Sequence, residues 1–163
     1  MSKYKVAGYV KLAKLWEKNK DKALIYHKKY YVDKFSDSPC FELADVYIDI
    51  TGKKETFNRP EMIRLLSDIE QQNVNCIFTQ TKGYIAANPK EFCYIIKLLF
   101  EFNPNINIVT EDENYNINTF VNEDSQKEAL IEMANHYVSL NLQDYNNWKD
   151  KIIQAINTIR NSI

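Results

Sequence analysis

The chain has 163 residues, of which 45% are hydrophobic and 26% are charged, and its formal net charge is −1. These values are typical of one soluble globular domain, and no run of about 18 apolar residues is present to cross a membrane. The first twenty residues lack the apolar stretch of a secretory signal, so we expect a cytoplasmic protein. A protein that binds duplex DNA through its phosphates is usually basic, so this charge predicts weak DNA binding or none.

The cysteines and histidines do not predict a metal site. The three cysteines, Cys40, Cys76 and Cys93, lack the paired spacing of a zinc site or a disulfide framework. The two histidines, His27 and His136, match no ligand motif. We therefore expect no metal ion and no other cofactor.

The first third of the chain predicts two strands with a helix between them. Residues Tyr4–Leu12 are apolar and β-prone, and Asp21–Phe35 has helical apolar spacing with Asp21 as a candidate N-cap. Ser36–Pro39 is typical of a turn, and Phe41–Ile50 predicts a second strand. The polar segment Thr51–Asn58 predicts an exposed loop.

The middle of the chain repeats this alternation. Pro60 and Pro89 each stand where a helix is expected to begin, because proline is tolerated in the first helical turn. The second of these helices should end at Asn103–Pro104. Short strands are expected before and after it, and a loop precedes it. These segments are Val74–Thr79 and Ile106–Thr110 for the strands and Gln80–Asn88 for the loop.

The last third is mostly helical. An acidic turn is expected over Glu111–Asn116, and Ile117–Val121 is a candidate fifth strand. From Glu123 the pattern is helical as far as Ile159, with a plausible break at Asn141–Asp144, where Asp144 could cap a new helix. We expect an α/β domain over residues 1–122 and a C-terminal helical segment over residues 123–163.

Strands that alternate with helices at spacings near 30 residues predict βαβ units. The expected fold class is therefore α/β. Its central sheet should have four or five mostly parallel strands with helices on both faces, giving three layers, and a long C-terminal helix should pack on this domain.

Three segments, in this order, resemble the motifs of the serine-recombinase (resolvase and invertase) N-terminal catalytic domain. The first strand ends in a sequence similar to the family's Tyr-x-Arg-Val-Ser, the second strand and its loop resemble "YxD, SGT, RP", and a later loop stands in the place of Asp-Arg-Leu-x-Arg. The resemblance covers about residues 4–160 and includes the long C-terminal helix. The segments are Gly8–Ala13, Val46–Asp49 with Thr51–Gly52 and Asn58–Pro60, and Thr81–Pro89.

The resemblance implies a phosphoryl transfer in which a serine attacks a DNA phosphate and arginines stabilise the transition state. In this chain the place of the serine falls on Ala13, and the arginine two residues earlier is Lys11. In the later loop the aspartate place is Gly83, and the two arginine places are Tyr84 and Ala87. Among these catalytic positions, only Arg59 keeps the family's residue type. The neutral sequence at residues 140–143 also departs from the charged family pattern. We therefore expect a catalytically degenerate member that does not cut DNA.

The remaining residues of this site allow two interpretations each. Arg59 is either a surviving phosphate contact or a solvated loop residue. Lys11 and Lys82 either form an anion or DNA contact together with Arg59 or are independent surface lysines. Tyr84 either stacks on a base or covers apolar surface.

The C-terminal helical segment carries more apolar surface than one sheet face needs, which favours a partner interface. We expect a homodimer or a higher homo-oligomer. The alternative is that the segment folds back onto its own domain. The candidate interface residues are Ile131, Ala134, Tyr137, Val138, Trp148, Ile152, Ile156 and Ile159.

Three functions remain open from the sequence. The first is an inactive recombinase-like oligomerisation or regulatory protein linked to a mobile element or plasmid, which could pair with an active recombinase. The second is a non-cleaving DNA-binding accessory protein. The family's helix-turn-helix after the long helix is missing before Ile163, which weighs against it. The third is an enzyme with different chemistry, which no catalytic motif supports.

Overall fold

A central sheet of four strands organises the molecule. The computed structural model describes residues 3–112, 116–121 and 123–162. The strands lie in the order β2-β1-β3-β4 and every pair is parallel. Their bounds are β1 Tyr4–Leu12, β2 Phe41–Ile50, β3 Cys76–Thr79 and β4 Asn107–Thr110. The predicted bounds of β1 and β2 are confirmed, and β3 and β4 are shorter than predicted.

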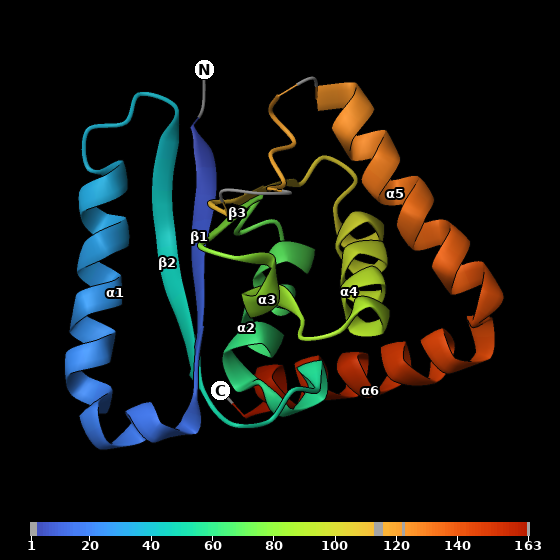
Figure 1. The fold of residues 1–163 in the computed structure, drawn as a ribbon, viewed down its shortest axis with the longest axis horizontal. Coiled ribbons are helices and arrows are strands. Elements are labelled where there is room, and N and C mark those ends of the chain that lie inside the picture. The colour runs from blue at the N-terminus through green and yellow to red at the C-terminus, as the bar shows by residue number, and fades with distance from the viewer. Residues whose placement is uncertain (1–2, 113–115, 122, 163) are drawn as a thin grey trace.

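Helices cover both faces of this sheet, which gives the three layers expected from the sequence (Figure 1). α1 (Lys20–Phe35) follows the 3-10 helix η1 (Lys14–Asn19) and covers one face. α2 (Pro60–Glu70) and α4 (Pro89–Phe102) cover the other face. Two short elements lie in the connections at one end of the sheet. They are the 3-10 helix η2 (Thr56–Asn58) and the single turn α3 (Lys82–Ile85).

β1 is buried in the middle of the sheet because it pairs with β2 on one side and β3 on the other. Its centre requires a glycine. A Cβ atom built at Gly8 would lie 2.7 Å from ring carbons of Tyr31, which packs from α1 across the strand. Burial of Tyr31 against the backbone of Gly8 therefore sets how closely α1 approaches the sheet.

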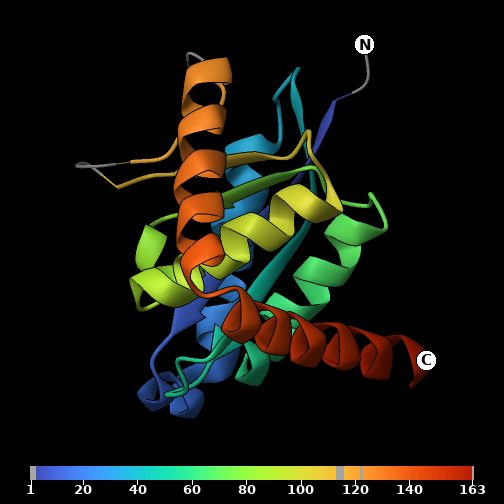
Figure 2. The same cartoon turned by 90° about the vertical axis from the view of Figure 1, so that its right-hand side faces the viewer.

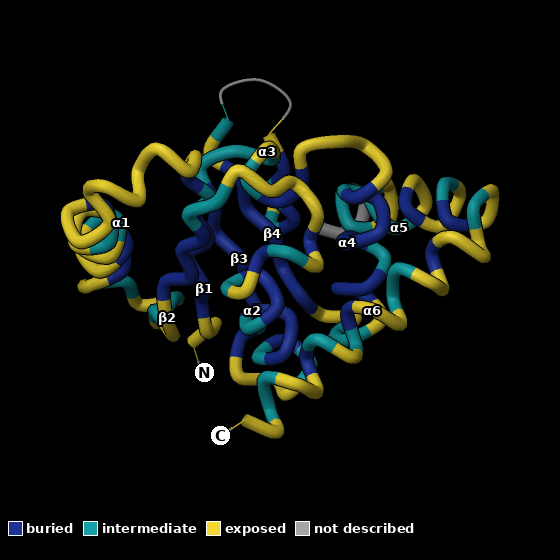
Figure 3. Tube along the Cα trace, turned by 90° about the horizontal axis from the view of Figure 1, so that it is seen from below, coloured by how far each residue is buried: buried dark blue, intermediate teal, exposed yellow. Residues whose placement is uncertain are grey.

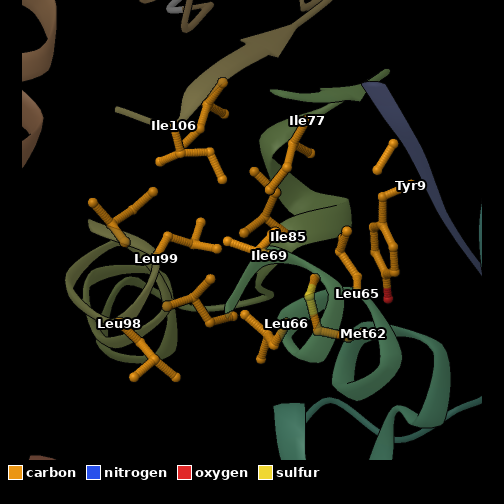
Figure 4. Close-up of a cluster of buried hydrophobic side chains, with 14 of the residues drawn as sticks. Tyr9, Met62, Leu65, Leu66, Ile69, Ile77, Ile85, Leu98, Leu99 and Ile106 are labelled. Atoms are coloured by element: carbon orange, nitrogen blue, oxygen red, sulfur yellow. The ribbon is translucent and has the colours of Figure 1, made fainter. Parts of the chain in front are cut away.

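The larger hydrophobic core lies on the α2 and α4 side of the sheet. Figure 4 shows Leu65 and Leu66 of α2 facing Leu98 and Leu99 of α4, with Ile77 of β3 above them. All five side chains are buried. These leucines lie on the buried sides of the two helices, and their removal from water stabilises the domain.

Two long helices complete this core from outside. α5 (Glu123–Leu140) packs along α4, and α6 (Leu142–Asn161) crosses beneath α2 at a steep angle to α5 (Figure 2). The expected break is confirmed, but the predicted cap is wrong. Asn141 is the N-cap residue of α6, whereas Asp144 lies in its first turn. Among the residues that the structure describes, no helix is long and apolar enough to cross a membrane.

Three loop predictions need correction. Thr56, predicted in an exposed loop, is fully buried within η2. Residues 80–88 include the turn α3. The candidate fifth strand, Ile117–Val121, is not a strand. Asn118 forms an isolated antiparallel bridge with Val109. The backbone N–H of Thr119 also donates to the carbonyl of Ile108. The predicted acidic turn falls partly on residues 113–115, which lie outside the described residues.

Candidate functional site

The residues that carried the family resemblance meet at the carboxyl ends of β1 and β2, where open α/β sheets commonly bind ligands. A groove of about 610 Å³ lies there between η1 and the loop after β2. Its lining mixes both signs of charge, with Lys20 and Lys53 against Glu17, Asp49 and Glu61. This groove is therefore not a uniformly positive phosphate site.

Arg59 is completely buried, although its chain neighbours Asn58 and Pro60 both line this groove. Its Nη1 donates to the carbonyl oxygen of Tyr84 at 2.8 Å and to the hydroxyl of Tyr9 at 3.2 Å. Its Nη2 donates to the carbonyl oxygen of Ile85 at 2.6 Å and to Oγ1 of Thr56 at 3.3 Å. The guanidinium thus fastens the α3 turn to β1 and η2.

Asp49 satisfies the opposite side of this network. Oδ2 of Asp49 accepts the hydroxyl proton of Tyr9 at 2.8 Å and the backbone N–H of Met62 at 2.9 Å. Oδ1 accepts the backbone N–H of Glu61 at 2.9 Å. A carboxylate at this position stabilises α2 because the first N–H groups of a helix have no partner within it.

A second buried carboxylate holds η2. Oε2 of Glu91 accepts from both the backbone N–H and the hydroxyl of Thr56, and Oγ1 of Thr56 in turn accepts from Arg59. Glu91 belongs to the first turn of α4, whose N-cap Asn88 accepts the backbone N–H of Glu91 at 2.9 Å. Arg59 therefore lies between Asp49 and Glu91, and one hydroxyl group separates it from each.

Burial corrects both interpretations of Arg59. The residue is neither solvated nor open to a phosphate, since four of its N–H groups already bond to protein oxygens. Burial also raises the pKa of the Tyr9 hydroxyl far above its ordinary value, against the opposing effect of the Arg59 charge. Tyr9 is therefore a neutral hydrogen-bond bridge at neutral pH, which excludes it as an ionised base.

Lys11 and Ala13 lie further along β1, toward solvent. Nζ of Lys11 reaches the carbonyl of Thr51 at 3.4 Å. The pKa of Lys11 is lowered, first by burial and then by the positive charge of Arg59. Ala13 is exposed and precedes η1, and its side chain is a methyl group. The end of β1 therefore presents the ammonium group of Lys11 and the methyl group of Ala13, and neither side chain carries a hydroxyl.

The α3 turn supplies backbone groups rather than side chains to the network. Tyr84 is half-buried and packs against the hydrophobic core on the α2 and α4 side and against a second one on the α1 side. This supports the interpretation that it covers apolar surface. Gly83 and Ala87 are exposed, and both line a shallow pocket together with Lys82. The backbone N–H of Lys82 donates to Asp112 at 2.9 Å. The structure thus brings Lys11 close to Arg59, but it does not place Arg59 on the surface with the lysines.

Sequence reasoning missed the buried partners of Arg59. Tyr9 and Asp49 lay within the quoted motifs, yet neither was named as a site residue. The position of Asp49, at the end of a strand and shortly before a Pro-initiated helix, was the available signal. No comparable signal identified Thr56 or Glu91, because 35 residues separate them in the chain.

The candidate dimer residues lie against the chain's own domain. Four of them are buried among the domain's own hydrophobic side chains, and they are Ala134, Val138, Ile152 and Ile156. The other four are partly buried against the same side chains, and they are Ile131, Tyr137, Trp148 and Ile159. Dimerisation through this stripe would require α5 and α6 to leave the domain. Self-association itself stays a prediction.

Comparison with known proteins supports the fold assignment. No known family's sequence profile matches the chain, and no curated protein sequence matches it. The N-terminal catalytic domain of TP901-1 integrase is similar in structure, with a TM-score of 0.59 and 20% identity over 83% of this chain and 98% of that one. A resolvase family site-specific recombinase from Streptococcus pneumoniae is similar with a TM-score of 0.52 and 14% identity, over 97% and 99% of the two chains.

At these identities the similarity concerns the fold. The expected fold class is confirmed: this is an α/β domain with an all-parallel four-stranded sheet flanked by helices, and it is structurally similar to the N-terminal catalytic domains of serine recombinases and resolvases.

Proposed function

We propose that this chain is a serine-recombinase-like domain that does not cleave DNA and acts as an oligomerisation or regulatory protein, linked to a mobile element or plasmid. The observation that carries the proposal is the side chain at the end of β1. Ala13 stands where the resemblance places the nucleophilic serine, and a methyl group cannot attack phosphorus.

The arginine of this site supports the same proposal. Arg59 donates to carbonyl oxygens and hydroxyls inside the domain and is fully buried. A transition-state donor must point at the place where charge develops, and losing one such donor commonly costs about 2.7–4 kcal/mol of activation free energy. Lys11 offers a point charge in place of the planar fork of an arginine.

The experiment that tests the proposal is a cleavage assay with supercoiled plasmid. We expect neither nicked plasmid nor a covalent protein–DNA adduct on a denaturing gel, with an active serine recombinase on its own site as the positive control. The Ala13→Ser variant should also be inactive, because Gly83, Tyr84 and Ala87 still supply no charged group. An adduct formed by the unmodified chain would contradict the proposal.

The oligomerisation part has its own test, which is sizing chromatography with light scattering across a range of protein concentrations. We expect a species of at least twice the chain mass of 19.2 kDa at the highest concentrations. A strict monomer throughout would contradict this part, whatever the cleavage assay shows.

A second candidate function is a non-cleaving DNA-binding accessory protein, which one observation favours. Residues 3–35 contain ten lysines against three acidic residues, so the positive charge is concentrated at one end of the chain. A fluorescent 30-base-pair duplex, titrated at low and then rising salt, tests it. Binding that weakens steeply with salt supports this candidate, and no binding at low salt removes it.

A further inference from the structure

We infer that this chain binds a second copy of itself head to tail, with the outer face of α1 in one copy packed on the outer face of α5 in the next. The inference rests on the oligomerisation part of the proposed function and names the two surfaces. Neither surface is the candidate dimer stripe, whose residues are buried or partly buried against the domain.

The first support is the separation of charge along the chain. Residues 3–35 contain ten lysines and three acidic residues, whereas residues 36–163 contain eleven basic and nineteen acidic residues. α1 and α5 form opposite outer layers of the molecule, as Figures 1 and 3 show. The total charge is therefore near zero although residues 3–35 are basic and residues 36–163 are acidic. The basic part of one copy can attract the acidic part of another.

The outer face of α1 carries alternating lysine and aliphatic side chains. Lys22, Ile25, Lys29 and Val32 follow one another at intervals of three, four and three residues, which places them on one ridge of the helix. Ile25 is 67% exposed and Val32 is 52% exposed. The opposite side of α1 buries Ala23, Tyr31 and Phe35 against the sheet. Two aliphatic side chains thus face solvent on a helix whose core contacts are already made.

The outer face of α5 carries a matching ridge. Ala129, Met133, His136 and Leu140 are all exposed and follow at intervals of four, three and four residues. Leu140 is 70% exposed and Met133 is 43% exposed. The exposed carboxylates of Glu128 and Glu132 lie beside this ridge.

The two ridges fit each other in spacing and in charge. Ile25 and Val32 are seven residues apart, as are Met133 and Leu140, and seven residues of helix span about 10.5 Å. Two apolar pairs of equal spacing can interdigitate when ridges pack into grooves. Lys22 and Lys29 then lie near Glu128 and Glu132, which directs the pairing toward the unlike surface.

A nucleic acid fits the α1 ridge less well than a second copy. Phosphate groups gain nothing from Ile25 and Val32. Because α1 and α5 lie on opposite sides of the molecule, each bound copy leaves one ridge open, so the assembly can grow or close into a ring.

Complementary variants test the inference. The first variant carries Ile25→Ser and Val32→Ser, and the second carries Met133→Ser and Leu140→Ser. All four positions are exposed, so both variants should keep the circular dichroism spectrum of the wild type. Leu142→Ser is the matched control, since Leu142 is also exposed but lies outside both ridges. Sedimentation velocity measures association for each variant alone and for a 1:1 mixture.

We expect each variant alone to lose self-association by at least about tenfold in Kd. The control should associate like the wild type. The mixture should form heterodimers and nothing larger, because each such dimer uses the one intact ridge from each variant. An interface that uses the same patch twice would not recover on mixing.

Four results would overturn the inference. If the wild type associates and both variants associate equally well, the oligomerisation role stands and these ridges are wrong. If the mixture stays monomeric, the pairing of α1 with α5 is wrong. A third result concerns DNA. If both variants still self-associate but the α1 variant no longer binds a single-stranded 30-nucleotide DNA that the wild type binds, the α1 ridge binds nucleic acid instead. A wild type that never associates contradicts the oligomerisation role itself.

Discussion

The inner and outer halves of the strand-end site differ in how their side chains are used. In the inner half, Tyr9, Asp49 and Arg59 are buried and bonded to one another or to backbone groups. In the outer half, Ala13 and Ala87 are exposed and offer no charged group. The inner half matches the residue types of the family motifs, and the outer half departs from them.

This difference shows that motif residues can serve the fold rather than the reaction. Arg59 connects three segments that are distant in sequence, and Asp49 satisfies the start of α2. Both tasks exist whether or not DNA is cut. A chain can therefore keep these residue types for the sake of the fold, so their presence alone is weak evidence for the activity.

The largest effect is expected from Arg59→Ala. The substitution leaves the Tyr84 and Ile85 carbonyls unpaired and removes the cation between the buried carboxylates of Asp49 and Glu91. We expect a loss of about 3–5 kcal/mol in the free energy of unfolding, measured by urea denaturation. Arg64→Ala is the control, and its partly exposed ion pairs should contribute about 1 kcal/mol or less. Equal losses would remove the distinction between buried and exposed groups.

A smaller effect is expected from Tyr9→Phe. This change keeps the ring but removes the hydroxyl that donates to Asp49 and accepts from Arg59. An unsatisfied buried partner typically costs about 1–3 kcal/mol, which thermal and urea unfolding would both detect. Tyr30→Phe, whose hydroxyl bonds to Glu111 at the surface, should cost less. A neutral result for Tyr9→Phe would mean that Asp49 and Arg59 do not need the bridge.

The smallest effect is expected from Lys11→Gln. Lys11 lies in the outer half and makes one long hydrogen bond, so the free energy of unfolding should change by less than about 0.5 kcal/mol at pH 7. The folded state lowers the pKa of Lys11 from its ordinary value of 10.5. The unfolded chain therefore holds the proton more tightly in the window just below pH 10.5, and folded stability rises with pH there.

Urea denaturation at pH 8 and pH 10 checks this sign. The stability of the wild type relative to Lys11→Gln should increase toward the higher pH, and the comparison between the two proteins cancels the ionisation of their shared tyrosines. A relative decrease would show that the folded state favours protonated Lys11.

The sequence predicted the succession of strands and helices along the chain because that succession depends on local patterns, and the alternation in turn indicated a mostly parallel sheet. Apolar runs such as Tyr4–Leu12, and prolines at positions 60 and 89, act within one element. The segment after β4 was mistaken for a strand because Ile117 is buried as a strand residue would be, although it pairs through one isolated bridge. Periodicity cannot separate these two cases.

The site was less predictable because its defining property is burial. Position in the motif singled out Arg59, but its burial depends on where α3 and η2 fold over it. The role of Glu91 depends on packing between segments 35 residues apart. The apolar stripe of α5 and α6 was visible in the sequence, but the surface it covers was not.

The position of α6 also determines when the domain can form during synthesis. Ile152 and Ile156 belong to the main hydrophobic core, and Arg160 pairs with Glu70 at 2.7 Å and bonds to Ser67. A ribosome adds about 5–20 residues per second, so α6 is synthesised several seconds after the strands that it helps to cover. During that interval the apolar faces of α2 and α4 remain open on the nascent chain, which makes them natural substrates for a chaperone that holds unfolded segments.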